Sequence, residues 1–216
     1  MADIFDEVDE ELRAERAQKL WQRYGGLITG ALFLVVGGVA GWQGWEWWQN
    51  RQNLEAATAY LEAQRATEAE GADYAAMAGR FEAIAANAPT GYRTLARLRA
   101  AALHAEAGQR EQARAQWDAV ARDTAADPLY RDLASMLWAL HGVESADPAL
   151  LAARLAPLTQ EASPWRASAR EVQALVALRQ GNTTEARETL RALANDSSAP
   201  QGVRDRAGRI AAGIGG

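Results

Sequence analysis

The chain has 216 residues, of which 49% are apolar and 24% charged, so it is long enough for one domain plus a short additional segment and is not disordered in composition. The absence of cysteine excludes disulfides, thiolate zinc sites, iron–sulfur clusters and thiol catalysis. The net charge of −5 argues against a general nucleic-acid binder, which needs a basic surface. About 50 alanines, and 22 arginines against the single Lys19, indicate a helix-rich chain whose positive charge is carried by guanidinium groups.

Residues 1–23 form a charged segment in which acidic residues precede basic ones, the order that a helix macrodipole favours. Apolar residues recur there at helical spacing: Ile4 or Phe5, then Val8 and Leu12. We expect a short amphipathic helix. Its narrow apolar stripe either binds a partner or leans on neighbouring structure or lipid.

Residues 24–45 contain no charged side chain. At 1.5 Å per residue this stretch spans roughly 33 Å as a helix, enough to cross a hydrocarbon core of about 30 Å. Aromatic residues of the type found at membrane interfaces stand at its two ends: Trp21 and Tyr24, then Trp42, Trp45, Trp47 and Trp48. These flanks argue against a buried helix of a soluble protein. Since the end of the stretch offers no A-x-A cleavage site, we expect an uncleaved transmembrane signal anchor rather than a removed leader.

The basic residues around this segment predict its orientation. Four lie shortly before it, namely Arg13, Arg16, Lys19 and Arg23, and only Arg51 lies close behind it. The positive-inside rule then places the amino end in the cytoplasm. Residues 46–216 are expected in the periplasm, in a single-pass protein of a bacterial inner membrane.

Glycines inside the segment follow a small-xxx-small pattern, with Gly26 paired to Gly30 and Gly37 to Gly41. A face without side chains lets another helix approach closely, so Gly30, Gly37 and Gly41 are candidates for helix packing in the membrane. The alternative is that these glycines only reflect the high frequency of glycine in membrane helices.

The rest of the chain is helical in pattern and carries an internal repeat. Prolines recur at Pro89, Pro128, Pro164 and Pro200. Behind each proline comes a bulky residue and then an arginine. The four arginines are Arg93, Arg131, Arg166 and Arg204.

A second mark of the repeat is a glycine turn followed by residues at fixed spacing. Gly108 leads to Ala113, Trp117 and Val120, and Gly181 leads to Ala186, Leu190 and Leu193. This spacing resembles the second half of a tetratricopeptide unit, and Phe81 and Leu155 fit the same position in the other two units. We therefore predict an all-α chain: one transmembrane helix followed by a tetratricopeptide-like solenoid over residues 46–216. Its first helix, residues 50–70, is expected to continue the membrane helix.

The sequence offers no catalytic motif. The two histidines, His104 and His141, have no carboxylate at metal-binding spacing and are interpreted as structural residues of consecutive first helices. No G-x-S-x-G, Walker or dinucleotide-binding pattern occurs. We expect a protein that is not an enzyme, with no cofactor, no metal and no small-molecule substrate.

Candidate partner-binding residues follow from the solenoid alone, because stacked repeats leave a concave surface of first-helix residues. By phase these are Leu98, Met136 and Leu140. The row of Arg93, Arg131, Arg166 and Arg204 allows two interpretations. It either holds acidic residues of a partner, or it bonds backbone carbonyls or an acidic neighbour in the previous repeat and so defines the joint between repeats.

Several features together resemble the YfgM family, the ancillary subunits of the SecYEG translocon. They are the charged start, the Tyr24-Gly25 entry, the exit with Gly41-Trp42 and Trp45, the polar residues 49–52 and the repeats. The resemblance implies a non-catalytic inner-membrane protein whose periplasmic repeats associate with the translocon and with a membrane-anchored prolyl-isomerase-like chaperone. Two alternatives are an assembly or scaffolding factor for another envelope complex and a membrane-tethered enzyme or cytosolic regulator.

Overall fold

The computed structural model describes the backbone of residues 3–214 and the side chains of residues 21–27 and 29–214. The described residues form nine α-helices and one 3₁₀ helix, with no strand. The chain divides into two compact units, residues 1–52 and residues 53–216. The helices are α1 (Asp3–Thr67), α2 (Tyr74–Asn87), α3 (Thr90–Glu106), α4 (Arg110–Arg122), α5 (Pro128–Gly142), α6 (Pro148–Leu155), η1 (Ala156–Thr159), α7 (Arg166–Arg179), α8 (Thr183–Asn195) and α9 (Gln201–Gly213).

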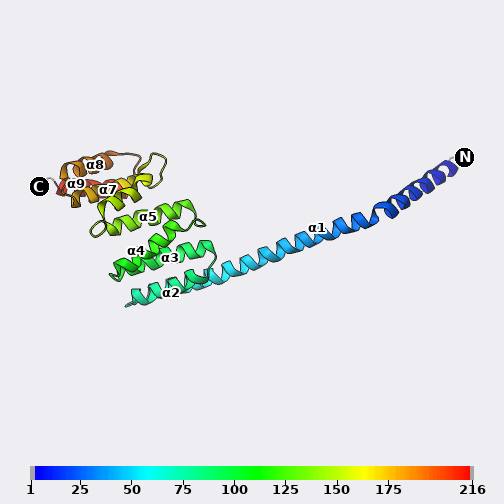
Figure 1. Cartoon of the computed structure of the whole chain (residues 1–216), viewed down its shortest axis with the longest axis horizontal. Helices are drawn as coiled ribbons and strands as arrows, with labels where there is room; N and C mark the ends of the chain where they lie inside the picture. The colour runs from blue at the N-terminus through cyan, green and yellow to red at the C-terminus, as the bar shows by residue number, and fades with distance from the viewer. Residues whose placement is uncertain (1–2, 215–216) are drawn as a thin grey trace. The chain divides into compact units, whose positions relative to one another are not determined.

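The first unit is the amino-terminal part of α1. One uninterrupted helix runs from Asp3 to Thr67, so the separate short helix expected at the start is instead the first part of α1 (Figure 1). The stripe of Ile4, Phe5, Val8 and Leu12 lies outside the residues whose side chains are described. The predicted continuation of the apolar helix through residues 50–67 is confirmed.

The apolar part of α1 is long and apolar enough to cross a membrane, and it is the one such helix among the described residues. Its side chains are almost entirely uncovered within the chain. Leu32, Phe33 and Leu34 are 61%, 74% and 79% exposed. The aromatic residues Trp42, Trp45 and Trp47 beyond them are also exposed.

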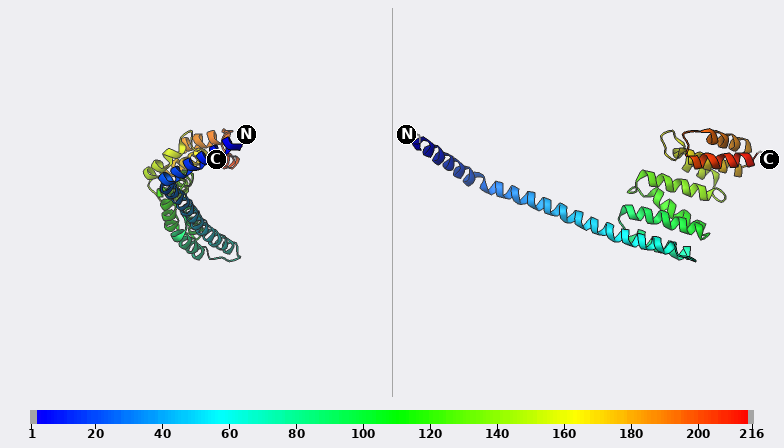
Figure 2. Two further views of the ribbon diagram at one scale, coloured as in Figure 1. Left: turned by 90° about the vertical axis from the view of Figure 1, so that its right-hand side faces the viewer. Right: turned by 180° about the vertical axis from the view of Figure 1, so that it is seen from behind.

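The second unit is a stack of antiparallel helix pairs. The end of α1 precedes α2, and the following pairs are α3 with α4, α5 with α6, and α7 with α8. Helix α9 packs on α8 and closes the stack, as expected for the truncated last repeat. Successive layers are visible from α2 to α9 in Figure 1, and the helices follow a curved path in the end-on view of Figure 2. The predicted all-α, tetratricopeptide-like fold is confirmed.

Local sequence signals account for the helix ends. The carboxylates of Asp73, Asp127 and Asp147 accept hydrogen bonds from backbone N–H groups in the first turns of α2, α5 and α6. Gly108 and Gly181 adopt φ values of +74° and +82° at the turns that close α3 and α7. Because a Cβ is strained at such values, glycine is required at both turns.

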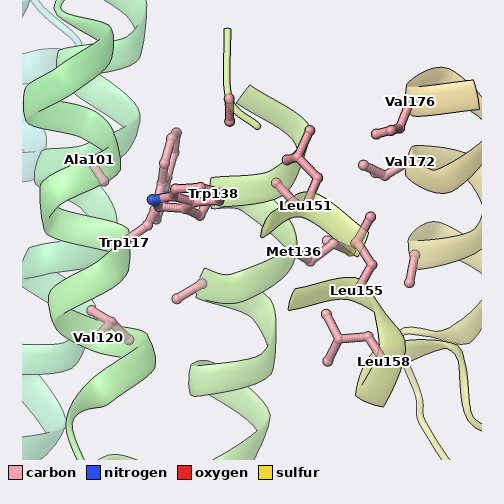
Figure 3. Close-up of a cluster of buried hydrophobic side chains, with 14 of the residues drawn as sticks. Ala101, Trp117, Val120, Met136, Trp138, Leu151, Leu155, Leu158, Val172 and Val176 are labelled. Carbon is pink, nitrogen blue, oxygen red and sulfur yellow. The ribbon is translucent and has the colours of Figure 1, made fainter. Parts of the chain in front are cut away.

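The core lies between the layers. The second-helix residues expected to be buried are so: Ala113, Trp117, Val120, Ala186, Leu190 and Leu193 are at most 2% exposed. Phe81 and Leu155 are fully covered. The largest cluster joins α3 through α7. Trp117 lies by Trp138 on one side of it, and Leu151 and Leu155 lie between these rings and Val172 and Val176 of α7 (Figure 3).

The middle repeat departs from the others. Its second helix, α6, has 8 residues, whereas α4 and α8 have 13 each. Pro157 has no backbone N–H with which to continue the α-helical hydrogen bonds, and the chain tightens into η1 there. Leu158 of η1 is still 1% exposed and completes the core in place of a longer helix.

Candidate partner-binding site

Counting from the repeated arginines aligns equivalent positions in the first helices of three repeats. Nine residues after Arg93, Arg131 and Arg166 come Ala102, Leu140 and Leu175, and twelve residues after them come Ala105, Val143 and Leu178. All six of these side chains are at least partly accessible. We call these six residues the first-helix face.

The three residues predicted for the groove lie at different depths. Leu140 belongs to the first-helix face and is 39% exposed. Leu98 is half-buried against the central cluster, and Met136 is 8% exposed within that cluster. Both occupy the position five residues after the repeated arginine, in the middle of a helix that its neighbours cover. Met136 is a core residue in this structure, and of the three only Leu140 presents an exposed side chain.

A hollow of about 380 Å³ opens at the first-helix face between the ends of α5 and α7. Its lining is apolar in the middle, with Leu140, Val143, Leu175 and Leu178. The charged or titratable residues Arg110, His141 and Glu144 complete it. We call it the α5–α7 hollow. A concave apolar surface with a few polar groups at its edge is the usual form of a binding site.

The apolar lining of the hollow reflects side chains of the first-helix face that differ from repeat to repeat. At the nine-residue position, α3 has Ala102 where α5 and α7 have leucines. At the twelve-residue position, Ala105 is replaced by Val143 and then Leu178. The last two repeats therefore present a larger apolar surface than the one before them.

Polar groups hold the edge of the hollow in place. Arg110 at the start of α4 bonds Glu144 at 3.2 Å, in a pair whose side chains are 62% and 78% exposed. Arg179 of α7 donates from one nitrogen to the carbonyl oxygens of Val143 and Ala146, at 2.7 and 2.6 Å. Arg179 does not line the hollow itself, but it bonds the carbonyl of the lining residue Val143 and no carboxylate among the described residues, so it adds a second guanidinium beside the pair of Arg110 and Glu144.

His141 lines the same hollow. Its ring stacks on Trp117, with the ring centroids 4.5 Å apart. Burial, and next the charge of Arg110, lower the pKa of His141 below its ordinary value. The imidazole is therefore neutral at pH 7, where it adds aromatic surface rather than charge.

Two of the four repeated arginines form joints inside a repeat. Arg93 lies 3.7 Å from Asp123 at the end of α4, and Arg166 lies 3.3 Å from Asp196 at the end of α8. Hydrogen bonds from Ser198 lower the pKa of Asp196, and the nearby Arg166 lowers it further. For these two arginines the contacts fit the structural interpretation, except that the acidic partner belongs to the same repeat.

The other two repeated arginines, Arg131 and Arg204, have no such partner. The short α6 places no aspartate opposite Arg131, and no further helix follows α9 among the described residues. Neither arginine forms a side-chain hydrogen bond or ion pair with a described residue, and the Nε of each is buried. Binding of a partner's carboxylates by these two positions stays a prediction.

Other arginines at the joints were not singled out from the sequence. Trp138 lies between Arg114 of α4 and Arg154 of α6, 4.5 and 4.0 Å from its ring centre. Arg206 of α9 donates two hydrogen bonds, a bidentate pair, to the carboxylate of the buried Glu171 of α7, at 2.8 and 2.7 Å. The only sequence signal for these contacts was the excess of arginine over lysine, since a planar guanidinium stacks on rings and grips carboxylates where an ammonium does not.

His104 is held as a structural residue between three helices. It is buried on α3, and one ring nitrogen lies 2.9 Å from Glu82 of α2 while the other lies 2.6 Å from Gln109. Gln116 of α4 donates to the same Glu82 oxygen at 2.7 Å. Among the residues with described side chains, no group of three or more histidine, aspartate or glutamate side chains is placed to hold a metal ion.

Gly30, Gly37 and Gly41 lie on the apolar part of α1. Apart from the neighbouring residues and backbone of α1 itself, a Cβ built at any of the three would meet no atom within 4 Å. Nothing described within the chain covers these positions, and the packing of another helix against them stays a prediction.

The comparisons with known proteins give one match. Residues 18–205 match the protein family described as tetratricopeptide repeat-like domain, a range that includes both the apolar part of α1 and nearly all of the repeats. No curated protein and no solved structure matches the chain. Since the family match covers far more than half of the sequence and the helix pairs have the expected glycine turns and buried residues, the chain belongs to the tetratricopeptide repeat-like domain family.

Proposed function

We propose that this protein is a non-catalytic, single-span membrane protein that serves as an accessory factor in protein export. Its amino end lies in the cytoplasm of a bacterium, α1 anchors it in the inner membrane, and its repeats bind proteins in the periplasm. Tetratricopeptide-like repeats are protein-interaction modules, so the interaction itself follows from the family. The anchor, the side of the membrane and the export role are the proposal.

The observation that carries the proposal is the exposure of the apolar part of α1. Side chains such as Phe33 and Leu34 are more than 70% exposed, and no described residue covers them. In a bilayer these apolar side chains contact hydrocarbon, which is favourable, whereas their exposure to water is unfavourable. The exposed tryptophans at 42, 45, 47 and 48 suit the interface of that bilayer.

The export role rests on the resemblance to the YfgM family of translocon subunits. The features that carry it, residues 19–52, lie within the range matched by the family, which starts at residue 18. The partners proposed are the Sec translocon and a membrane-anchored, prolyl-isomerase-like chaperone. Anchoring a binding surface beside an exit channel raises its effective concentration for emerging chains, so weak contacts suffice.

Contact with the translocon is proposed to use the glycine face of α1. Gly37 and Gly41 leave open space into which a neighbouring membrane helix fits closely. Emerging chains and chaperones are proposed to use the first-helix face, where Leu140 is exposed.

Photocrosslinking in living cells tests both contacts. A photoreactive residue at Gly37 is compared with one at Val39, which points to the opposite side of the same helix because two residues turn it by about 200°. A second probe at Leu140 is compared with one at Glu188 on α8. Adducts of translocon subunits at residue 37 but not 39, and of secreted chains or chaperones at 140 but not 188, are the expected result.

Other outcomes would redirect the proposal. Adducts with a different envelope complex at residues 37 and 140 would replace the export role with an assembly or scaffolding role. A reporter fused after Gly216 tests the orientation independently. Activity of a reporter that works only in the cytoplasm would contradict the periplasmic placement of the repeats.

A further inference from the structure

The α5–α7 hollow is the part of the first-helix face that the chain leaves open. Leu140 is 39% exposed, although side chains in the core just beside it, such as Trp138 and Ala139, are at most 5% exposed. The hollow's volume of about 380 Å³ lies within the range of about 300–1,000 Å³ typical of ligand sites. It is large enough for one or two apolar side chains of a partner, and too small for a folded domain.

The charge at the edge of the hollow differs in sign from the chain as a whole. The protein has a formal net charge of −5. At the hollow, Arg110 is offset by Glu144, while Arg179 bonds only carbonyl oxygens, so the local balance is positive. The pair of Arg110 and Glu144 is highly exposed and therefore weak, which leaves Arg110 open to exchange with another carboxylate.

We propose that the α5–α7 hollow selects acidic segments of partner proteins that carry a leucine or a similar apolar side chain. The apolar side chain enters between Leu140, Leu175 and Leu178. A neighbouring carboxylate of the segment bonds Arg110, which lines the hollow, or Arg179, whose guanidinium lies against the carbonyl of the lining residue Val143. This inference rests on the proposed role of the first-helix face in binding proteins, and it adds the chemistry of the ligand.

The selection follows from desolvation and charge. Leucine gains from burial against four apolar residues, whereas a polar side chain loses its bonds to water there. A segment rich in lysine places like charges beside the two arginines and is rejected. Arginine favours carboxylates because its fork-shaped donors match the two oxygens.

Binding is measured by fluorescence anisotropy with the full chain in lipid nanodiscs. The probe is a labelled twelve-residue peptide with two leucines spaced for one helix face and glutamates around them. Two matched peptides have lysine in place of the glutamates or serine in place of the leucines. We expect the acidic leucine peptide to bind at least tenfold more tightly than either of the others.

Matched variants locate the site. Arg110→Glu reverses a charge at the edge and suits the first turn of α4, where the macrodipole favours an acidic residue. Leu140→Ser removes apolar surface from the hollow. Each is expected to lower the affinity for the acidic peptide at least fivefold. The control variants, Arg191→Glu on α8 and Leu150→Ser on α6, change exposed positions outside the hollow and should leave this affinity unchanged.

Three results would overturn the inference: equal affinity for the glutamate and lysine peptides, no loss in Arg110→Glu and Leu140→Ser, or equal losses in the two controls. The test is independent of the export role. If photocrosslinking finds no translocon or chaperone while the peptide pattern holds, the export role fails and the ligand chemistry of the hollow stands.

Discussion

The apolar part of α1 and the core of the repeats use the same kinds of side chain with opposite results. In α1, Leu34 and Trp42 are 79% and 73% exposed, whereas Leu155 and Trp117 in the repeats are at most 1% exposed. Burial of a large apolar side chain stabilises the folded state by about 1.5–3 kcal/mol. The repeats obtain this stabilisation from their own neighbours, whereas no described residue provides it to the apolar part of α1.

The strongest test of this contrast compares two tryptophans. Trp117→Ala leaves a large cavity between α3, α4 and α5, so we expect the free energy of unfolding of the repeats to fall by about 3–5 kcal/mol. Trp42→Ala removes an exposed ring and should change it by about 0.5 kcal/mol or less. Urea unfolding followed by far-ultraviolet circular dichroism measures both. Equal losses would break the comparison.

The second largest effect is expected from a charged residue introduced into the apolar part of α1, and it is measured as membrane insertion rather than as unfolding. Leu34→Arg is expected to raise the free energy of membrane insertion by about 2.5–3.5 kcal/mol, because arginine is poorly tolerated at the centre of a spanning helix. Extraction of membranes with alkaline carbonate should release more of this variant than of Leu34→Ala. The unfolding of the repeats should not change, and retention equal to that of Leu34→Ala would contradict the proposed membrane anchor.

Glycine positions sharpen the contrast within the repeats. Gly181 has a φ of +82°, so Gly181→Ala should lower stability by about 1–2 kcal/mol. Gly91 lies in the first turn of α3 with open space around a built Cβ, so Gly91→Ala should instead raise stability by about 0.4–1 kcal/mol. Thermal unfolding of the two variants should shift in opposite directions, and shifts of the same sign would refute the turn assignment.

The smallest effect concerns pH. Because burial lowers the pKa of His141 in the folded state, the unfolded state binds more protons between that pKa and the ordinary value near 6.5. The contribution of neutral His141 to the free energy of unfolding is therefore fully present above about pH 6.5, and it is lost as the pH falls below that value. His141→Phe keeps the stack on Trp117 without the titration, so its unfolding should depend less on pH between 7.5 and 5.5. Identical pH dependence in the two proteins would exclude this role.

The regular repeats were the part of the fold that local sequence patterns could predict. Glycine at 108 and 181 and the buried residues 113, 117 and 120 are set by one helix and its nearest neighbour, so a fixed spacing reveals them. The shape of the middle repeat was harder to foresee. Pro157 was visible, but its effect depends on Leu158 finding a core position from a 3₁₀ turn.

The candidate site could be predicted only in part, because phase gives the rotation of a residue and not what covers it. Met136 and Val143 differ by only about 20° in helical rotation, yet Met136 lies in the core and Val143 lines the hollow at the helix end. Contacts such as Arg179 with the carbonyl of Val143 join residues 36 apart in sequence, and no local pattern marks them.

The arginine joints have a chemical consequence. The chain has no lysine after residue 19, so the amino groups that acylating reagents, carbamylation or amine crosslinkers attack are missing from every repeat. Guanidinium groups also keep their proton over the whole range of pH in which proteins stay folded. In contacts such as Arg206 with Glu171 and Arg179 with its two carbonyls, the guanidinium groups therefore keep their positive charge under reagents that would neutralise a lysine.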